Sequence, residues 1–546
     1  MESISVSLLL LSAVVVSGTL TRLSPIPVPQ PIVQIALGAA IASVADLGVT
    51  LDPDLFFLLF LPPLLFLDGW RIPKEGLLRD KGVILELALG LVVFTVLGVG
   101  LLVHLLIPSM PLAVAFALAA VVSPTDPIAV SAIAARVPIP HRLMHILEGE
   151  SLLNDASGLV CMRFAVAAAL TGTFSLVDAV GTFFWVAIGG IAIGVALTWL
   201  VMQAQRFLTR RLGEETGSQI LISLLIPFAA YLVAEHLHCS GILAAVAAGV
   251  TMSFGERSGR ASATTRVRRT AVWDTVQFSM NGIIFVLLGE QLPQIAASAI
   301  HIVRETGHYD PLWLIVYVVA INLALAVLRF VWVWISLRFT LYRAARSGIE
   351  FKRPSWRLVA ATSLAGARGA ITLAGVLTLP LTMGDGSPFP GRDLAIFLAA
   401  GVIIVSLVAA SIGLPFLLKN LEIPPEPSSQ REEDEARIRG AEAAIRAIEA
   451  MQHDMGEGRA DADIYADAGA RLMDFYRQRI DGRSKTGDDA ELARRIDEIE
   501  RRLRLAGVQA ERAEFFRLAK GRKLSEDLMK KLVRETDLAE ARFSVT

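Results

Sequence analysis

The sequence predicts an all-α, polytopic membrane protein with about thirteen transmembrane helices and a soluble helical C-terminal tail. Of its 546 residues, 54% are hydrophobic and only 19% are charged, whereas ordinary soluble domains carry about a quarter charged residues. The charge is also unevenly placed: residues 421–546 hold 24 Lys/Arg and 28 Asp/Glu, while residues 1–420 hold 27 and 24. We therefore expect a transmembrane domain over residues 1–420 and a cytoplasmic helical tail over residues 421–546.

Composition also excludes several classes of protein. A net charge of −1 offers no basic field for phosphates, so we expect no nucleic-acid partner. Cys161 and Cys239 lie in apolar surroundings, so we expect them to be small core residues. They form no CxxC pair that could hold a metal, and we expect no resident cofactor. The apolar stretch over residues 5–20 has no basic region before it, so we expect a retained first span rather than a cleaved signal peptide.

The span count rests on apolar segments of about 20 residues. They are centred near residues 12, 36, 60, 94, 122, 157, 190, 228, 246, 284, 323, 370 and 406. With thirteen spans, one set of alternate loops holds 21 Lys/Arg and the other only Arg304 and Arg392. Because basic loops stay in the cytoplasm, the N-terminus is predicted outside and the C-terminus inside.

An odd count also fits two inverted six-helix repeats around one linking helix, a layout of many secondary transporters. Two segments in corresponding halves are interrupted, by SPTDP at 123–127 and by TSLAGARGA at 362–370. We expect both to be discontinuous helices that cross.

Ionisable groups inside apolar spans are the informative residues, because each costs several kcal/mol at the bilayer centre and needs a cavity or a partner. Six stand out: Asp126, Glu150, Asp155, Arg163, Arg329 and Arg368. One interpretation is a set of structural ion pairs that hold the bundle together. The acids, however, concentrate in two adjacent segments, which favours an ion site.

Asp126 lies between two prolines, Pro124 and Pro127. Each proline disfavours helix at the residue before it, so Thr125 and Asp126 fall where the helix unwinds. Unwound backbone at membrane depth is tolerated where it lines a cavity. Hydroxyl, carboxylate and carbonyl oxygens suit an alkali cation, whereas a simple proline kink leaves the aspartate unexplained.

The segment HILEGESLLNDASG at 145–158 carries two polar pairs at helical spacing. Ser151 and Asp155 share one face, and Glu150 and Asn154 share the neighbouring face. Ionised Asp155 can hold a cation and protonated Asp155 cannot, so a cation and a proton compete for one site.

The remaining charges are predicted to be structural. Few positive partners exist in the bilayer, and we expect Glu150 to form a buried pair with Arg329. Arg368, at the break in its segment, is expected to neutralise the partial negative ends of broken helices. Arg163 lies eight residues after Asp155 and receives no role.

Five motifs, spread in order over residues 5–420, carry a resemblance to a known family: FLPPLLFLDG, SPTDP, GESLLNDASG, NGIIFVLLG and GARGAI. Together they resemble the sodium/proton exchangers of the monovalent cation/proton antiporter family. The likeness is to the bacterial NhaP-like branch, which is similar to animal NHE exchangers. The resemblance implies a thirteen-helix fold, a homodimer, and an elevator-type mechanism with separate core and dimerisation domains.

Carried over by position, the resemblance implies that Asp155 is the essential carboxylate. Ser151, Asp126 and the backbone of Thr125 would complete a Na⁺ site around it. Asn154 takes the asparagine place of the family's asparagine–aspartate pair, and this single-aspartate form resembles electroneutral exchangers. A further implied feature is the family's buried acid–base pair, matched by Glu150 and Arg329.

The sequence therefore predicts a secondary transporter, not an enzyme, that exchanges Na⁺, Li⁺ or K⁺ for protons across the bacterial cytoplasmic membrane, for pH and sodium homeostasis. A K⁺/H⁺ antiporter remains open. A cation channel with a regulatory tail is a further alternative, although the repeated pore loop expected of one is not seen. A transporter-like sensor would need a signalling domain, and none is recognised.

The tail resembles no family. Apolar positions over residues 491–519 predict an amphipathic helix or a short helical hairpin. A plain helical appendage and a regulatory domain that senses pH or a partner both remain open.

Overall fold

The computed structural model describes residues 2–24, 28–44, 53–72, 81–126, 141–172, 176–256, 262–305, 312–346, 355–419, 427–456, 462–485 and 488–544. The chain divides into two compact units, Met1–Leu421 and Glu422–Thr546. Throughout the described residues the regular elements are helices, apart from one isolated bridge between Thr382 and Pro388.

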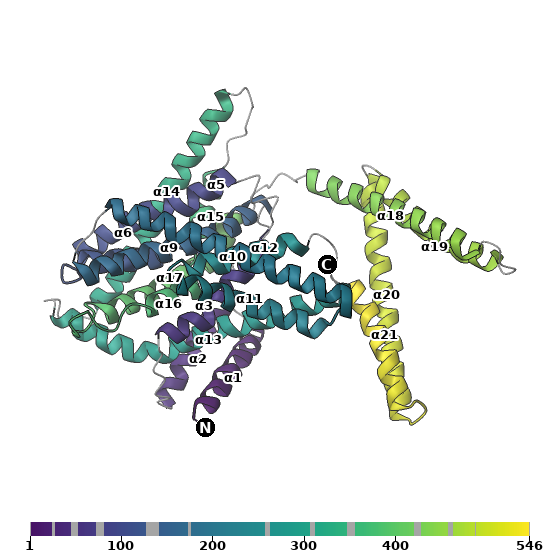
Figure 1. Cartoon of the computed structure of the whole chain (residues 1–546), viewed down its shortest axis with the longest axis horizontal. Helices are drawn as coiled ribbons and strands as arrows, with labels where there is room; N and C mark the ends of the chain where they lie inside the picture. The colour runs from purple at the N-terminus through teal and green to yellow at the C-terminus, as the bar shows by residue number, and fades with distance from the viewer. Residues whose placement is uncertain are drawn as a thin grey trace. The chain divides into compact units, whose positions relative to one another are not determined.

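The first unit is a bundle of long apolar helices (Figure 1). In chain order its first half comprises α1 (Glu2–Leu23), α2 (Gln30–Val44), α3 (Pro53–Arg71), α5 (Lys81–Leu85), the π-helix η1 (Glu86–Leu91), α6 (Val92–Leu106), α7 (Leu112–Val122) and α9 (His141–Thr171). Its second half comprises α10 (Leu176–Leu212), α11 (Thr216–His236), α12 (Gly241–Glu256), α13 (Ala263–Glu305), α14 (Leu312–Arg346), α15 (Trp356–Leu364), α16 (Ala370–Leu377) and α17 (Arg392–Leu418).

Eight helices among the described residues are long and apolar enough to cross a membrane, and three shorter apolar helices accompany them. Large apolar side chains point outward, for example Leu105 at 76% exposure and Trp185 at 73%. Such a surface would aggregate in water and suits contact with lipid. These observations establish a helical multi-pass membrane protein; the count of thirteen spans and the inverted repeats remain predictions.

Both segments predicted to be interrupted are interrupted where the structure describes them. α7 ends at Val122, and the chain is non-helical from there to Asp126. α15 ends at Leu364 and α16 starts at Ala370. The continuation of the first segment beyond Asp126 lies outside the described residues. The two breaks touch, because the Asp126 backbone N–H donates to the carbonyl of Ala367 at 2.7 Å.

Glycines let several pairs of helices pack backbone against backbone, among them α2 with α13 and α3 with α12. Between α2 and α13, a Cβ on Gly38 or on Gly289 would collide with a carbonyl of the facing helix. Gly69 and Gly249 make the same close approach between α3 and α12. Small residues allow this packing in membranes, where lipid tails supply no hydrophobic drive to association. We call these contacts the two glycine seams.

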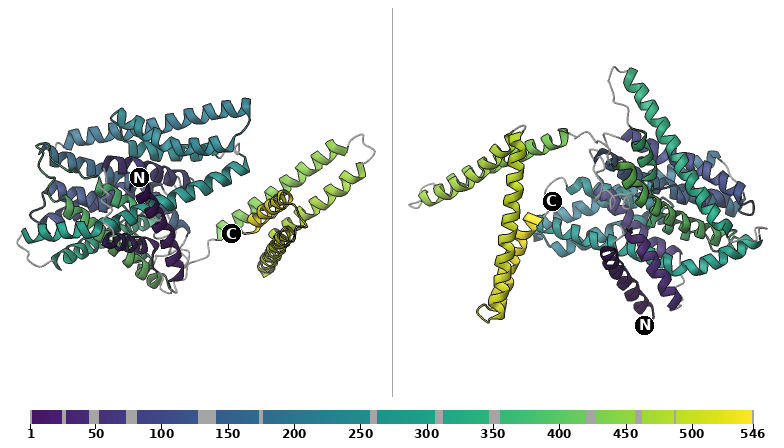
Figure 2. Two further views of the ribbon diagram at one scale, coloured as in Figure 1. Left: turned by 90° about the horizontal axis from the view of Figure 1, so that it is seen from below. Right: turned by 180° about the vertical axis from the view of Figure 1, so that it is seen from behind.

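The second unit is a set of charged helices, α18 (Pro427–Gly456), α19 (Ala462–Ser484), α20 (Asp488–Lys520) and α21 (Glu526–Ser544). α18 lies beside α19 and α20 beside α21 (Figure 2). Ion pairs such as Arg483–Asp434 at 2.7 Å join α19 to α18. The predicted apolar stripe lies on α20, but within this unit Ile496 and Leu503 are 54% and 68% exposed.

Candidate ion-binding site

A small cavity lies where the two helix breaks meet α9. It measures about 20 Å³, room for about one water molecule. Helices α3, α9, α13 and α16 and the break after α7 contribute its lining: Leu64, Asp68, Asp126, Ser151, Asp155, Gln277, Asn281, Ala370 and Ile371. Three carboxylates, a hydroxyl and two amides therefore surround a space of ionic size.

Asp155 and Ser151 present their side chains to this cavity from one face of α9. Both are buried, with 4% and 3% exposure. Among the residues that the structure describes, none donates a hydrogen bond to the Asp155 carboxylate. A buried carboxylate without a donor requires either a proton or a cation.

Asp126 reaches the cavity from the unwound segment after α7. Its carboxylate occupies the space where a Cβ on Gly369 would lie. Any side chain at position 369 would collide with Asp126, so this contact requires a glycine there. The two breaks thus fit together through one backbone hydrogen bond and one side chain lodged over a glycine.

Thr125 and Asn154 lie behind the cavity rather than on its described lining. Asn154 Nδ2 donates to Thr125 Oγ1 at 3.1 Å, and Thr125 Oγ1 donates to Glu150 Oε1 at 3.5 Å. The other amide atom, Asn154 Oδ1, is buried and has no hydrogen-bond partner. The Thr125 hydroxyl, expected to face a cation, is thus engaged with Asn154 and Glu150.

Glu150 and Arg329 form a two-pronged ion pair between α9 and α14. Arg329 Nη2 donates to Glu150 Oε2 at 2.7 Å, and Nη1 pairs with Oε1. Arg329 Nε donates to the carbonyl of Thr362 in α15 at 3.2 Å. The two residues are 0% and 3% exposed, so the pair ties three helices together away from water.

Arg368 binds backbone carbonyls at the breaks. Its Nε donates to the carbonyl of Val122 at 3.0 Å, and its Nη1 donates to that of Gly366. Its own backbone N–H donates to Ser406 Oγ at 3.1 Å. The guanidinium therefore lies against helix-end carbonyls that have lost their intrahelical partners.

Arg163 lies outside this cluster. It pairs with Glu235 of α11 at 3.0 Å, and Glu235 also accepts from the Gly241 N–H at 3.1 Å. The pair borders a larger cavity of about 560 Å³ between α3, α9, α11 and the end of α16. Arg163 thus links the helix that carries Asp155 to the turn between α11 and α12.

Sequence reasoning missed three residues that line the small cavity, Asp68, Gln277 and Asn281. Asp68 is the penultimate residue of the motif FLPPLLFLDG and was assigned no role from the sequence. Asn281 opens the motif NGIIFVLLG, and Gln277 precedes it by one helical turn. Four-residue spacing of two amides in an apolar helix was the available signal.

A membrane-embedded helical bundle with broken helices that meet at a buried carboxylate defines a secondary ion transporter. Comparison with known proteins identifies its kind. The family profile described as "Sodium/hydrogen exchanger, transmembrane" matches residues 9–420. The chain belongs to the sodium/hydrogen exchanger family, and it is a monovalent cation/proton antiporter.

Individual proteins similar to this chain carry names of the same kind. The chain is 42% identical to the uncharacterized Na⁺/H⁺ exchanger YjcE of Escherichia coli (strain K12), over 99% of each chain. It is 36% identical to the sodium, potassium, lithium and rubidium/H⁺ antiporter of Bacillus pumilus, over 96% of this chain and 76% of that one. Among solved structures it is similar in fold to the sodium proton antiporter MjNhaP1 of Methanocaldococcus jannaschii. That match has a TM-score of 0.60 at 18% identity and covers 77% of this chain and 99% of the other.

Proposed function

We propose that the protein exchanges Na⁺ for H⁺ one for one across the bacterial cytoplasmic membrane, with its C-terminus inside the cell, and so serves pH and sodium homeostasis. The observation that carries the proposal is the buried Asp155 carboxylate, without a described donor, in a cavity where two broken helices meet. Family membership supports the class of transport, and the cavity supports the choice of residue.

At this site Asp155 is the group that changes state. Ionised, it holds a dehydrated cation together with the Ser151 hydroxyl and the Asp126 carboxylate; protonated, it releases the cation. Because a cation and a proton replace each other on one carboxylate, the loaded and the protonated forms carry equal charge. One-for-one exchange further requires that Asp68 and Asp126 each keep one protonation state throughout the cycle.

The position of the larger cavity supports a path to this site. Both cavities border α3, α9 and the α16 segment. From the small cavity to the larger one, α9 advances from Asp155 to Met162 and the α16 segment from Ile371 to Thr378. Seven residues of helix correspond to about 10 Å. Under the predicted topology this end faces the outside, so we assign the larger cavity to the external access route.

Transport then needs α9 and α16 to carry the cation to the other side. We propose an elevator-type movement within a homodimer, in which the Arg163–Glu235 pair must open because it joins α9 to α11. The Glu150–Arg329 pair would stay closed and travel with α9.

K⁺ is the second candidate cargo. The antiporter of Bacillus pumilus, named for sodium, potassium, lithium and rubidium, matches nearly the whole chain and supports a site open to several alkali cations. Testing each cation separately in the same vesicles would measure the selectivity of transport.

The test uses full-length protein in sealed vesicles with an imposed pH gradient. Added Na⁺ should dissipate the gradient in the wild type and not in Asp155→Asn. Asp385→Asn serves as the matched control, since Asp385 lies in a loop far along the chain and contacts Ser387 only locally. Retained exchange at the wild-type rate in Asp155→Asn would remove Asp155 from the site. Rapid voltage-driven current would favour a channel.

A further inference from the structure

A third cavity lies apart from the ion site, at the ends of four helices. It measures about 310 Å³. Its lining comes from α10, α11, α12 and α13: Met202, Gln205, Arg206, Thr209, Arg210, Gln219, Ser223, Ile226, Met252, Gly255, Glu256 and Arg269. It shares no residue with the ion site, so what it binds is independent of the proposed exchange mechanism.

The α10 wall of this cavity is one helical face. Met202, Arg206 and Arg210 recur every four residues and bring two guanidinium groups to the same side. α10 has 37 residues, about 55 Å of helix, whereas the hydrocarbon core spans about 30 Å. Its last turns therefore extend into the headgroup region of the membrane. The adjacent Arg211 does not line the cavity, and its guanidinium lies 4.5 Å from the centre of the Phe207 ring.

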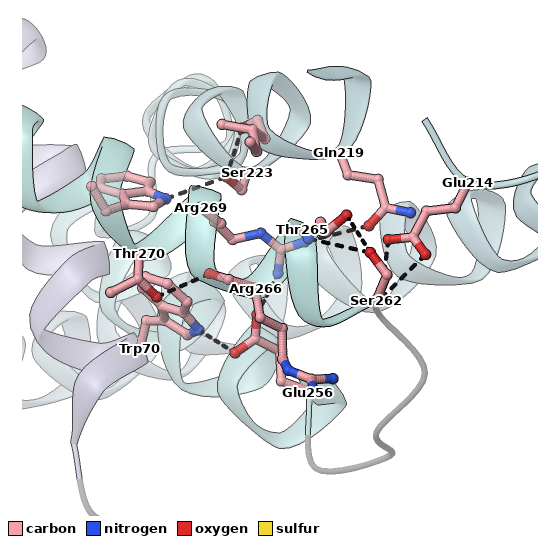
Figure 3. Close-up of polar contacts among 12 residues, drawn as sticks. Trp70, Glu214, Gln219, Ser223, Glu256, Ser262, Thr265, Arg266, Arg269 and Thr270 are labelled. Atoms are coloured by element: carbon pink, nitrogen blue, oxygen red, sulfur yellow. Dashed lines mark hydrogen bonds and ion pairs between the residues drawn. The ribbon is translucent and has the colours of Figure 1, made fainter. Parts of the chain in front are cut away.

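Arg269 lines the cavity, and its polar contacts are drawn in Figure 3. It is 5% exposed and pairs with Glu256, while its Nη2 donates to Gln219 at 3.4 Å. Its Nε is buried and has no hydrogen-bond partner. A buried guanidinium donor left unpaired is costly, and an additional acceptor in the cavity would satisfy it.

Acidic groups around the cavity do not cancel its positive charge. Glu256 divides its carboxylate between Arg269 and Trp70, whose Nε1 donates to it at 2.8 Å (Figure 3). Glu214, which is not part of the lining, is engaged by Ser262. Hydrogen bonds from Thr265 and then Ser262 lower the pKa of Glu214, so it stays anionic in that role. The lining thus holds three guanidinium groups against one carboxylate.

We propose that this cavity binds a phosphate-bearing anion, and that its source is the headgroup of an anionic phospholipid. Guanidinium groups match phosphate oxygens through paired, charge-assisted hydrogen bonds. On the side turned away from the cavity, α10 exposes large apolar side chains, including Leu200, Phe207 and Leu208 at 60%, 56% and 53%. Acyl chains would lie along that face while the phosphate enters between Arg206, Arg210 and Arg269.

The experiment measures Tm of the full-length protein in a neutral detergent during titration with phosphatidylglycerol, phosphatidylcholine or inorganic phosphate. Phosphatidylglycerol should raise Tm, and phosphatidylcholine should not. Stabilisation by inorganic phosphate at similar concentration would assign the site to a soluble phosphate compound instead. Stabilisation by neither phosphatidylglycerol nor phosphate would overturn the proposal.

Variants locate the site. R206A/R210A should bind phosphatidylglycerol at least about tenfold more weakly, because two charge-assisted contacts are lost. Arg211→Ala, one residue further along the same helix but outside the cavity, should bind like the wild type. Glu256→Gln should bind more tightly, since it removes the one competing carboxylate. Equal weakening in Arg211→Ala and in R206A/R210A would show only a general charge effect and would reject the site.

Discussion

Single carboxylates in this protein differ in their surroundings, and the difference assigns their roles. Glu150 is paired on both oxygens by Arg329 and cannot release its charge without leaving a buried cation behind. Asp126 is lodged over Gly369. Asp155 is equally buried but has no donor among the described residues, which supports its proposed role as the group that exchanges a proton for a cation.

The first prediction concerns the ion pair. Glu150→Gln or Arg329→Gln should lower Tm more than Asp155→Asn does, because one partner remains as an unpaired buried charge at a cost of about 3–5 kcal/mol. The double replacement should recover much of this loss. Thermal unfolding of the purified protein measures it, and equal Tm values for single and double variants would contradict a coupled pair.

The second prediction concerns Gly369. In Gly369→Ala the new methyl group would overlap the Asp126 carboxylate, so the two breaks must separate and transport should fall sharply. Gly384→Ala is the matched control, since a Cβ there meets nothing within 4 Å. Cation-dependent proton flux in vesicles compares the two. Similar rates in both variants would mean that the contact does not position Asp126 for exchange.

At the residue scale, the sequence predicted the buried ion pair better than it predicted the residues that line the ion cavity. Glu150 and Arg329 could be matched because a bilayer offers so few partners for a buried acid. Asp68 could not be assigned, because its place at the end of an apolar run looks the same for a surface acid as for a cavity acid. The Thr125 hydroxyl was expected to face the ion, and its orientation toward Asn154 depends on packing that spacing does not encode.

At the level of elements, proline and glycine marked the end of α7 and the break between α15 and α16 correctly. Pro124 and the run of small residues at 362–370 disfavour continuous helix, so a break was predictable at each. The crossing of the two segments was expected from the sequence only because they occupy corresponding positions in the two halves. In the structure the breaks touch through Asp126 and Ala367. Which residues of the two breaks face each other could be determined only from the structure.

The third prediction concerns α20. Hydrogen bonds from Arg501 and Arg502 lower the pKa of Glu498 from 4.5 to about 2. Because the folded-state pKa lies below the unfolded one, the stabilisation is complete above about pH 4.5 and disappears as the pH falls toward 2. Amide hydrogen exchange of α20 in the full-length protein, corrected for intrinsic rates, should show progressive loss of protection over that interval. Glu498→Gln should lack this component; an unchanged profile would mean that these pairs do not stabilise α20.

For the whole molecule, charge density alone predicted where the chain changes character, near residue 421. The division into two compact units falls between Leu421 and Glu422. The tail's amphipathic pattern predicted helices, but it did not reveal that Ile496 and Leu503 remain exposed within the unit. Apolar spacing specifies a face of the helix and not what that face contacts.

The fourth prediction is electroneutral exchange. If only Asp155 exchanges a proton, one cation crosses for each proton and no net charge moves. In vesicles clamped with a potassium ionophore, the Na⁺-driven proton flux should be independent of the imposed potential. A flux that follows the potential would mean that Asp68 or Asp126 also releases a proton, and Asp68→Asn and Asp126→Asn would then identify which one.

The two glycine seams have a consequence for how this molecule can move. Helices that touch through bare backbone cannot separate without leaving a gap that no side chain can fill. α3, with Asp68, is therefore fixed to α12, and α13, with Gln277 and Asn281, is fixed to α2. One wall of the ion cavity is thus packed tightly against its neighbours, while among the described residues no glycine of α9 or α16 makes such a backbone contact with it. Under the proposed elevator-type movement, these bare backbone contacts would keep α3 and α13 in the part that stays still, while α9 and α16 move.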